Sequence, residues 1–410
     1  MTTKILNDYR LKWNNLELVP LVVGGMGVEI STAELALEIA RLGGIGHISD
    51  ALITDISDRK FKTQFVNKKK NLYKDNINNL DKSNVQFDID DIYQATHLYV
   101  KDVMTKKNPN GMVFINCMEK LTMNNGRDTL SSRLNAAMDA GIDGITLSAG
   151  LHLNSINLIH NNPRFNEIKL GIVVSSSRAL NLFIQKAKRY NRIPDFVVIE
   201  GPLAGGHLGF SIDSWQNSNL EDIFYEVKEY CANNNINTKL IVAGGIFTGQ
   251  DAVHYLERGA AAVQVATRFT IAKECGLPYK VKQKYIQATI DDIEVNLTSP
   301  TGYPMRMLKN SPSIGGRMKP NCENLGYLLD RGKCAYIEEY EKAKHEYETQ
   351  QIPFIVKNKT CLCTQMQLFQ CYTCGHYTYR LKDTTHQLED GSYYIPSAEE
   401  IFNDYLFGVN

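Results

Sequence analysis

The stretch that decides the fold is Ile199-Glu200-Gly201-Pro202-Leu203-Ala204-Gly205-Gly206-His207-Leu208-Gly209-Phe210. The apolar run 196–199 predicts a buried strand, and it gives way at once to glycines, a proline and one histidine. Glycine lets the backbone approach a ligand closely, and histidine exchanges a proton near neutral pH. The stretch therefore predicts a strand ending in an active-site loop with His207 as catalytic base, whereas an isolated Gly-Gly-His would favour an ordinary turn.

Seven further apolar runs have the same character, each followed by a glycine-rich or polar loop. They are 18–23, 45–48, 112–117, 144–147, 169–174, 239–243 and 261–265. Helical patterns lie between several of them, including a helix that Ser31 should cap, with Glu34 completing a capping box. Eight strands alternating with helices over roughly 250 residues predict a closed (β/α)8 TIM barrel, with an open doubly wound α/β sheet as the alternative.

In such a barrel the carboxyl ends of all strands open on one face, so the loops after them should meet at one mouth. The residues expected there are Gly24, Gly25, Met26, Asn116, Ser148, Ser175, Gly206, His207, Gly244, Gly245, Gln264, Ala266 and Thr267. The last two loops stand where barrels commonly bind phosphate, because backbone N–H groups point at the anion. This predicts a phosphorylated cofactor or substrate. No strand is followed by a GxGxxG motif with an acidic residue downstream, so a Rossmann domain is not indicated.

Composition and charge give no reason to expect a nucleic-acid-binding or membrane protein. The chain has 410 residues, 43% of them hydrophobic, and its 45 basic and 45 acidic residues cancel. This balance gives no reason to expect a nucleic-acid partner. The polar N-terminus and the absence of any run of about 20 apolar residues predict a soluble, cytoplasmic protein without membrane attachment.

Five motifs in order carry a family resemblance. They are Gly24-Gly25-Met26-Gly27-Val28-Glu29-Ile30-Ser31, the loop 201–209 quoted above, Ala243-Gly244-Gly245-Ile246, Gln264-Val265-Ala266-Thr267-Arg268-Phe269 and Ser299-Pro300-Thr301-Gly302-Tyr303-Pro304-Met305-Arg306. Together they resemble the nitronate monooxygenase family, formerly called 2-nitropropane dioxygenases, whose barrel is shared with a flavin-dependent enoyl-ACP reductase. The resemblance covers about 18–309.

The resemblance implies an FMN-dependent oxidoreductase. It implies that FMN has its phosphate at Gly244, Gly245, Gln264 and Thr267, that Met26 and Asn116 lie beside the flavin, and that His207 is the catalytic base. The implied reaction is oxidation of alkyl nitronates with O2. Two alternatives stay open: an NAD(P)H-dependent reductase of an enoyl thioester or quinone, and a barrel lyase or isomerase of a phosphorylated substrate. The expected partners are a small-molecule substrate and O2 or NAD(P)H, and a homodimer is left open.

The rest of the chain departs from the barrel pattern. Residues 50–110 are rich in Lys, Asp and Asn and predict a charged helical insertion within a barrel domain at 1–310. Residues 311–410 predict a Cys-rich C-terminal appendage that packs on the barrel. Within it Cys361, Cys363, Cys371 and Cys374 are candidate ligands of a structural zinc ion, with buried thiols and an iron–sulfur cluster as the alternatives.

Overall fold

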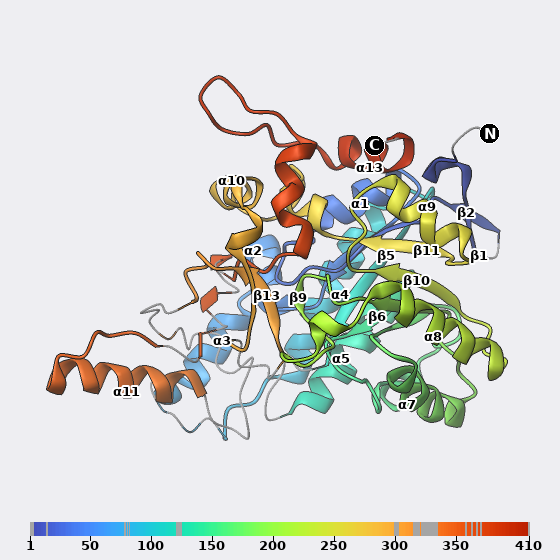
Figure 1. Ribbon diagram of the computed structural model, residues 1–410. Helices are drawn as coiled ribbons and strands as arrows, with labels where there is room; N and C mark the ends of the chain where they lie inside the picture. Colours follow the sequence, from blue (N-terminus) through green and yellow to red (C-terminus); the bar gives the residue numbers. More distant parts are fainter. Residues whose placement is uncertain are drawn as a thin grey trace.

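Eight parallel strands close into a barrel in the order β10-β11-β3-β4-β5-β6-β7-β8 (Figure 1). The computed structural model describes residues 4–13, 15–77, 79, 81, 83–119, 125–298, 303–314, 320, 335–356, 359–361, 364–365, 368–369 and 371–408. The barrel strands are β3 (Leu21–Val23), β4 (Ile45–Ser49), β5 (Met112–Met118), β6 (Gly144–Ser148), β7 (Lys169–Val174), β8 (Phe196–Glu200), β10 (Lys239–Ala243) and β11 (Ala262–Val265). The predicted TIM barrel is confirmed.

The predicted strand at 18–23 is wrong in one respect, because two elements share it. Leu18 belongs to β2 (Leu16–Leu18), which pairs antiparallel with β1 (Leu11–Trp13), and β3 begins only after Pro20. Proline lacks the N–H that a continuous strand would use. The hairpin closes the amino end of the barrel, where the ring of Trp13 lies 5.8 Å from Phe114 and 5.7 Å from Phe196.

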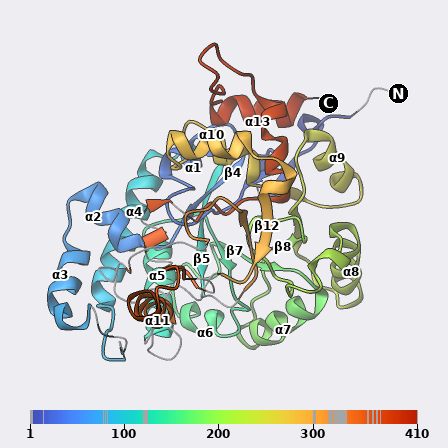
Figure 2. The same cartoon turned by 60° about the vertical axis from the view of Figure 1, so that its left-hand side comes forward.

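Helices surround the strands, as Figure 2 shows. The α-helices between barrel strands and directly after them are α1 (Ala33–Arg41), α4 (Ile89–Lys106), α5 (Gly126–Asp139), α6 (Ser155–Ile159), α7 (Ser177–Ala187), α8 (Leu220–Asn233), α9 (Gly249–Glu257) and α10 (Tyr279–Gln287). Short 3-10 helices are η1 (Leu6–Asp8), η2 (Lys74–Asn76), η3 (Lys188–Tyr190), η4 (Trp215–Asn217), η5 (Thr267–Ile271), η6 (Ile290–Asp292) and η8 (His376–Thr384). The expected cap of α1 is wrong by one residue: Thr32, not Ser31, accepts from the N–H of Leu35.

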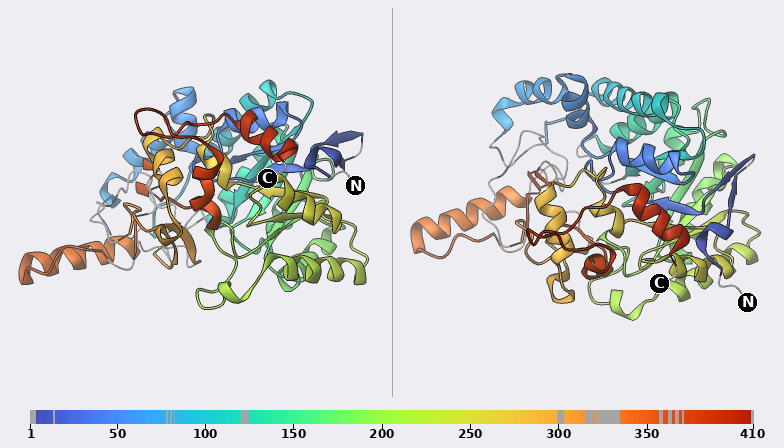
Figure 3. Two further views of the ribbon diagram at one scale, coloured as in Figure 1. Left: turned by 45° about the horizontal axis from the view of Figure 1, so that its top comes forward. Right: turned by 90° about the horizontal axis from the view of Figure 1, so that it is seen from above.

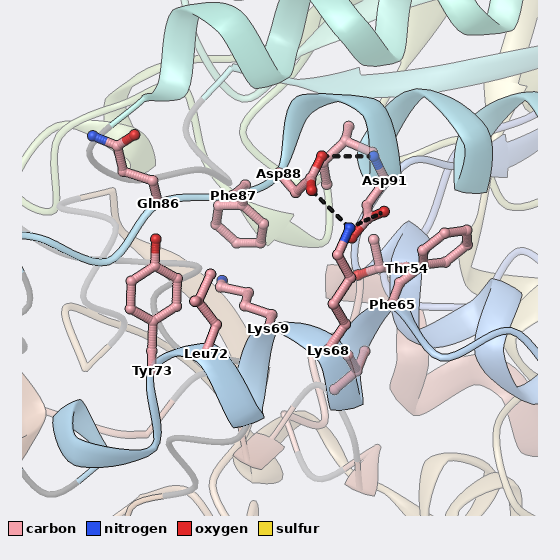
Figure 4. Close-up of a pocket in the computed structure, with 12 residues that line it drawn as sticks. Thr54, Phe65, Lys68, Lys69, Leu72, Tyr73, Gln86, Phe87, Asp88 and Asp91 are labelled. Atoms are coloured by element: carbon pink, nitrogen blue, oxygen red, sulfur yellow. Dashed lines mark hydrogen bonds and ion pairs between the residues drawn. The ribbon is translucent and has the colours of Figure 1, made fainter.

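The charged insertion is helical, but part of it belongs to the barrel. Among the described residues of this segment, the additional α-helices are α2 (Ile53–Phe61) and α3 (Phe65–Leu72), since α4 is the crossover from β4 to β5. A small pocket of about 40 Å³ lies between α3 and the start of α4 (Figure 4). Lys68 bridges Asp88 and Asp91 there, at 2.8 and 2.9 Å. The Lys68 side chain is therefore paired with two carboxylates, although it stays more than half exposed.

The chain after the barrel returns to its mouth. Strands β12 (Ile293–Asn296), β13 (Met305–Leu308) and β9 (Gly206–His207) form an antiparallel sheet. Residues 371–375 run along β13, because the N–H of Leu308 donates to Tyr372 and the N–H of Cys374 donates to Arg306. Helix α13 (Ala398–Phe407) packs against α1 and α9, whereas α11 (Ala335–Gln350) projects from the body in both views of Figure 3. A domain boundary near 310 stays a prediction.

No helix in the described ranges is long and apolar enough to cross a membrane.

Candidate active site

The barrel mouth opens into a cavity of about 530 Å³. The loops that follow the barrel strands form its floor and sides, and the C-terminal segment forms a further wall. Its lining includes every predicted mouth residue, namely Gly24, Gly25, Met26, Asn116, Ser148, Ser175, Gly206, His207, Gly244, Gly245, Gln264, Ala266 and Thr267. The volume is in the range of cofactor and ligand sites. The structure therefore brings the predicted residues together; the role of each stays a proposal.

The loop after β3 needs small residues because neighbouring side chains fill the space beside it. A Cβ at Gly24 would lie 3.1 Å from the side-chain nitrogen of Gln264, and a Cβ at Gly25 would overlap the side chain of Asn116. Ser31 braces this loop, since its hydroxyl accepts from the N–H of Met26 at 2.8 Å and donates to the carbonyl of Gly24 at 3.1 Å. The serine that was expected to cap α1 instead shapes the cavity.

The loop after β10 has a closely packed backbone in a conformation that suits glycine. Gly244 and Gly245 have φ of 87° and 102°, and a Cβ at Gly244 would lie 2.9 Å from the carbonyl oxygen of Gly201. The side-chain Oε1 of Gln264 is buried without a hydrogen-bond partner in the described part of the chain. Arg268 turns away from the cavity to an ion pair with Asp404 at 2.6 Å. Phosphate binding here would thus use backbone and amide groups rather than this cation.

His207 is held by a sheet rather than by a free loop. It pairs with Met305 of β13, and the N–H of Leu208 donates to the carbonyl of Pro304 at 2.8 Å. The imidazole meets the ring of Tyr303 edge to face, with centroids 6.2 Å apart. The side chain is partly exposed and lines the cavity. An imidazole fixed in this way at a cavity can remove or deliver a proton at a bound molecule.

Glu200 is a cavity residue that the sequence reasoning missed. It ends β8 and is the sole carboxyl group among the described lining residues. Burial raises its pKa to about 8, and the charge of Arg306 offsets this only in part. The sequence does contain a signal for this residue, because Glu200 ends an apolar run directly before the glycine loop. At neutral pH this group is therefore largely a protonated acid that can donate a hydrogen bond.

The raised pKa of Glu200 predicts that the folded protein becomes less stable against unfolding as the pH rises. The unfolded carboxyl ionises near its ordinary pKa of 4.5, whereas the folded one ionises near 8, so stability falls as pH rises between these values. Glu200→Gln should therefore raise the melting temperature of the cofactor-free protein more at pH 8 than at pH 5. Thermal unfolding across this range measures the difference. A constant offset at both pH values would show that Glu200 ionises normally.

The predicted zinc site finds no support in the described residues. They contain no group of three or more His, Cys, Asp or Glu side chains placed to hold a metal. Cys361 is buried, Cys371 donates to the Gln365 side chain at 2.9 Å, and Cys374 lines the cavity. Cys363 lies outside the described residues. The four-ligand site stays a prediction that elemental analysis of the purified protein checks: about one zinc per chain would support it, and metal-free protein would leave these cysteines as packed thiols.

Comparison with known proteins shows which family and which proteins this chain is similar to. The family model described as nitronate monooxygenase matches residues 10–313, about three quarters of the chain. Over short segments the chain is similar to a (3aS,4S,5R,7aS)-5-hydroxy-7a-methyl-1-oxo-octahydro-1H-indene-4-carboxyl-CoA dehydrogenase of Mycobacterium tuberculosis (31% identity over 28% of this chain) and to a probable nitronate monooxygenase of Staphylococcus saprophyticus (32% identity over 28%). These matches span 30% and 32% of the relatives' own lengths.

Solved structures share the fold over nearly the whole chain. FabK from Thermotoga maritima has 17% identity and a TM-score of 0.54, covering 94% of this chain and 91% of that one. A nitroalkane oxidase from Streptomyces ansochromogenes has 15% identity and a TM-score of 0.57, covering 94% of each. At such identities the likeness speaks for the fold alone.

Proposed function

The chain belongs to the nitronate monooxygenase family and is thus an oxidoreductase, and from this premise we propose that it is FMN-dependent and oxidises alkyl nitronates with O2. The observation that carries the proposal is that His207, the glycine loops after β3 and β10, and the loop after β11 all line one cavity. The partial match to a probable nitronate monooxygenase supports the choice of substrate.

The residues present fit FMN. The cavity is large enough for a cofactor, and the glycine loops after β3 and β10 are part of its lining. The buried Oε1 of Gln264 is an orphaned acceptor for a cofactor N–H or hydroxyl. Gly244, Gly245, Gln264 and Thr267 would hold the phosphate end, and Met26 and Asn116 would lie beside the ring system. When bound, FMN supplies the capacity to accept electrons from the substrate and pass them to O2.

The protein's own part in the reaction is proton transfer and positioning. The neutral imidazole of His207 would remove the proton from the carbon next to a nitro group, which converts a neutral nitroalkane into its nitronate. Pairing of β9 with β13 keeps the imidazole in place. A protonated Glu200 would donate a hydrogen bond inside the same cavity without adding negative charge. The cavity walls would exclude water from the bound substrate.

Oxygen uptake tests the proposed reaction. With an alkyl nitronate and O2, and without NAD(P)H, the purified protein should consume oxygen. The alternative reductase would stay idle until a pyridine nucleotide is added. Rapid NADH oxidation with an enoyl thioester or quinone, together with no response to nitronates, would replace the monooxygenase assignment by that of a reductase.

A further inference from the structure

The loop after β6 brings an exposed leucine to the cavity. Ser148, Ala149, Gly150 and Leu151 all belong to the cavity lining. Leu151 is 43% exposed, which is more than any other large apolar side chain among the described lining residues. An apolar side chain with open surface beside a cavity favours contact with an apolar part of a ligand.

The backbone on both sides of Leu151 has an unusual conformation. Ala149 and His152 have φ of 49° and 48°, in the left-handed region that residues other than glycine rarely adopt. Between them, Gly150 lies close against Glu119, because a Cβ at Gly150 would overlap that carboxylate. Such strained residues persist only where the surrounding structure fixes them, and they cluster at ligand sites. The shape of this loop therefore points to a role in binding.

His152 fixes this shape from beneath the loop. Its side chain is fully buried, and burial lowers the pKa of the imidazole, which keeps the ring neutral. The ring Nε2 donates to the carbonyl of Ser148 at 2.7 Å, so Nδ1 accepts from the hydroxyl of Ser155 at 2.8 Å. The backbone N–H of His152 donates to the carboxylate of Glu119 at 3.3 Å. The loop is thus tied to the end of β6 and to the start of α6.

The cavity offers no cation to a charged tail of a substrate. No lysine or arginine occurs among the described lining residues, and their one carboxyl group is Glu200. Burying a charged tail without a partner would be unfavourable. The part of a substrate that lies against Leu151 is therefore expected to be uncharged and apolar.

We propose that the loop 149–152 sets the chain-length preference of this enzyme. Leu151 contacts the alkyl substituent of the substrate, and His152 is a positioning residue that holds Leu151 in place. The inference rests on the proposed function, which supplies the reacting group. It adds the substrate class, namely nitronates whose alkyl chain is long enough to reach Leu151.

Steady-state kinetics with nitronates of increasing chain length tests Leu151. The parental protein should have a kcat/KM for hexyl nitronate about 10- to 100-fold above that for ethyl nitronate, because several more methylenes are buried. Leu151→Ala should lower this ratio about 5- to 10-fold, since it removes part of the apolar contact. Leu151→Met conserves the volume and should keep the ratio within about 2-fold. FMN content should be parental in both variants.

A second exposed leucine provides the matched control. Leu388 is 41% exposed and does not belong to the described cavity lining. Leu388→Ala should therefore keep the parental ratio. A parental ratio in FMN-loaded Leu151→Ala as well would overturn the assignment, because Leu151 would then make no contact with the chain.

His152→Asn separates the hydrogen bonds of His152 from its backbone conformation. Asparagine tolerates a left-handed φ but is too short to bridge Ser148 and Ser155. This variant should lower the chain-length ratio about as far as Leu151→Ala, and combining the two should lower it no further. A parental ratio in His152→Asn, or an additive loss in the double variant, would remove the positioning role. If His152→Asn does not fold, Ser155→Ala removes the partner of Nδ1 and makes the same test.

Failure of the proposed function is a separate outcome. If the parental protein turns over no nitronate, the nitronate assignment fails, and the role of Leu151 is measured by binding alone. Alkyl carboxylates carry two oxygens and a negative charge as nitronates do, and titration calorimetry should give a Kd that falls from propionate to heptanoate. Loss of this trend in Leu151→Ala would sustain the role of the loop. The same trend in the variant, or no trend in the parental protein, would refute it.

Discussion

His207→Ala should lower turnover of a neutral nitroalkane by about two to four orders of magnitude, the usual contribution of general acid–base catalysis. The physical reason is that the imidazole of His207 lines the cavity and is the group proposed to take the carbon-bound proton. FMN should stay bound, because the glycine loops after β3 and β10 are untouched. Anaerobic mixing with substrate, followed by flavin absorbance, measures the loss directly.

A preformed nitronate provides an internal control for His207→Ala. This substrate has already lost the proton, so its oxidation should suffer much less than that of the neutral nitroalkane. His254→Ala, at a partly exposed position on α9 beside Glu221, should behave as the parental protein with both. If His207→Ala reduces flavin with nitroalkane at the parental rate, His207 is a turn residue and not the base.

Gly244→Ala should weaken FMN binding about 10- to 100-fold, since overpacking a tight site typically costs about 1–3 kcal/mol. Gly244 combines a φ of 87° with close approach to the carbonyl of Gly201, so an added methyl group meets backbone that cannot move aside cheaply. This loop is also where the phosphate end of FMN is proposed to bind. Titration of cofactor-free protein with FMN, followed by flavin fluorescence, gives the change in Kd.

Gly141→Ala is the matched control for Gly244→Ala. Gly141 has a φ of 96°, but its added Cβ would meet nothing within 4 Å. It should therefore show the backbone strain of a left-handed alanine as a modest loss of thermal stability, with FMN affinity unchanged. Equal FMN affinity in the two variants would place the phosphate elsewhere in the cavity.

Local sequence patterns predicted the barrel strands and the mouth residues well, for a physical reason. Buried parallel strands read as short apolar runs, and their carboxyl ends must meet once the barrel closes. Asn116 and His207 could therefore be placed in one cavity, because Asn116 lies near the carboxyl end of one strand and His207 in the loop after another. The error at 18–23 arose because the run was treated as one strand although Pro20 interrupts it, and proline separates the hairpin strand from the barrel strand.

Tertiary contacts, which local sequence patterns do not show, determine the positions of several other residues around the cavity. Ser31 has the sequence context of a helix cap, yet its hydroxyl bonds within the loop after β3. Gln365 lies more than 150 residues from His207 in the sequence, and no periodicity links the two. Glu200 was passed over because the apolar run appeared to end at Ile199, although a carboxyl at a strand end is itself a signal of a site.

The absorption spectrum of the purified protein tests the central claim most directly, namely that this cavity binds FMN. The account predicts the bands of an oxidised flavin, a released cofactor identified as FMN by mass, and their loss and recovery when FMN is removed and added back. A colourless protein that cannot be reconstituted with FMN would contradict the account.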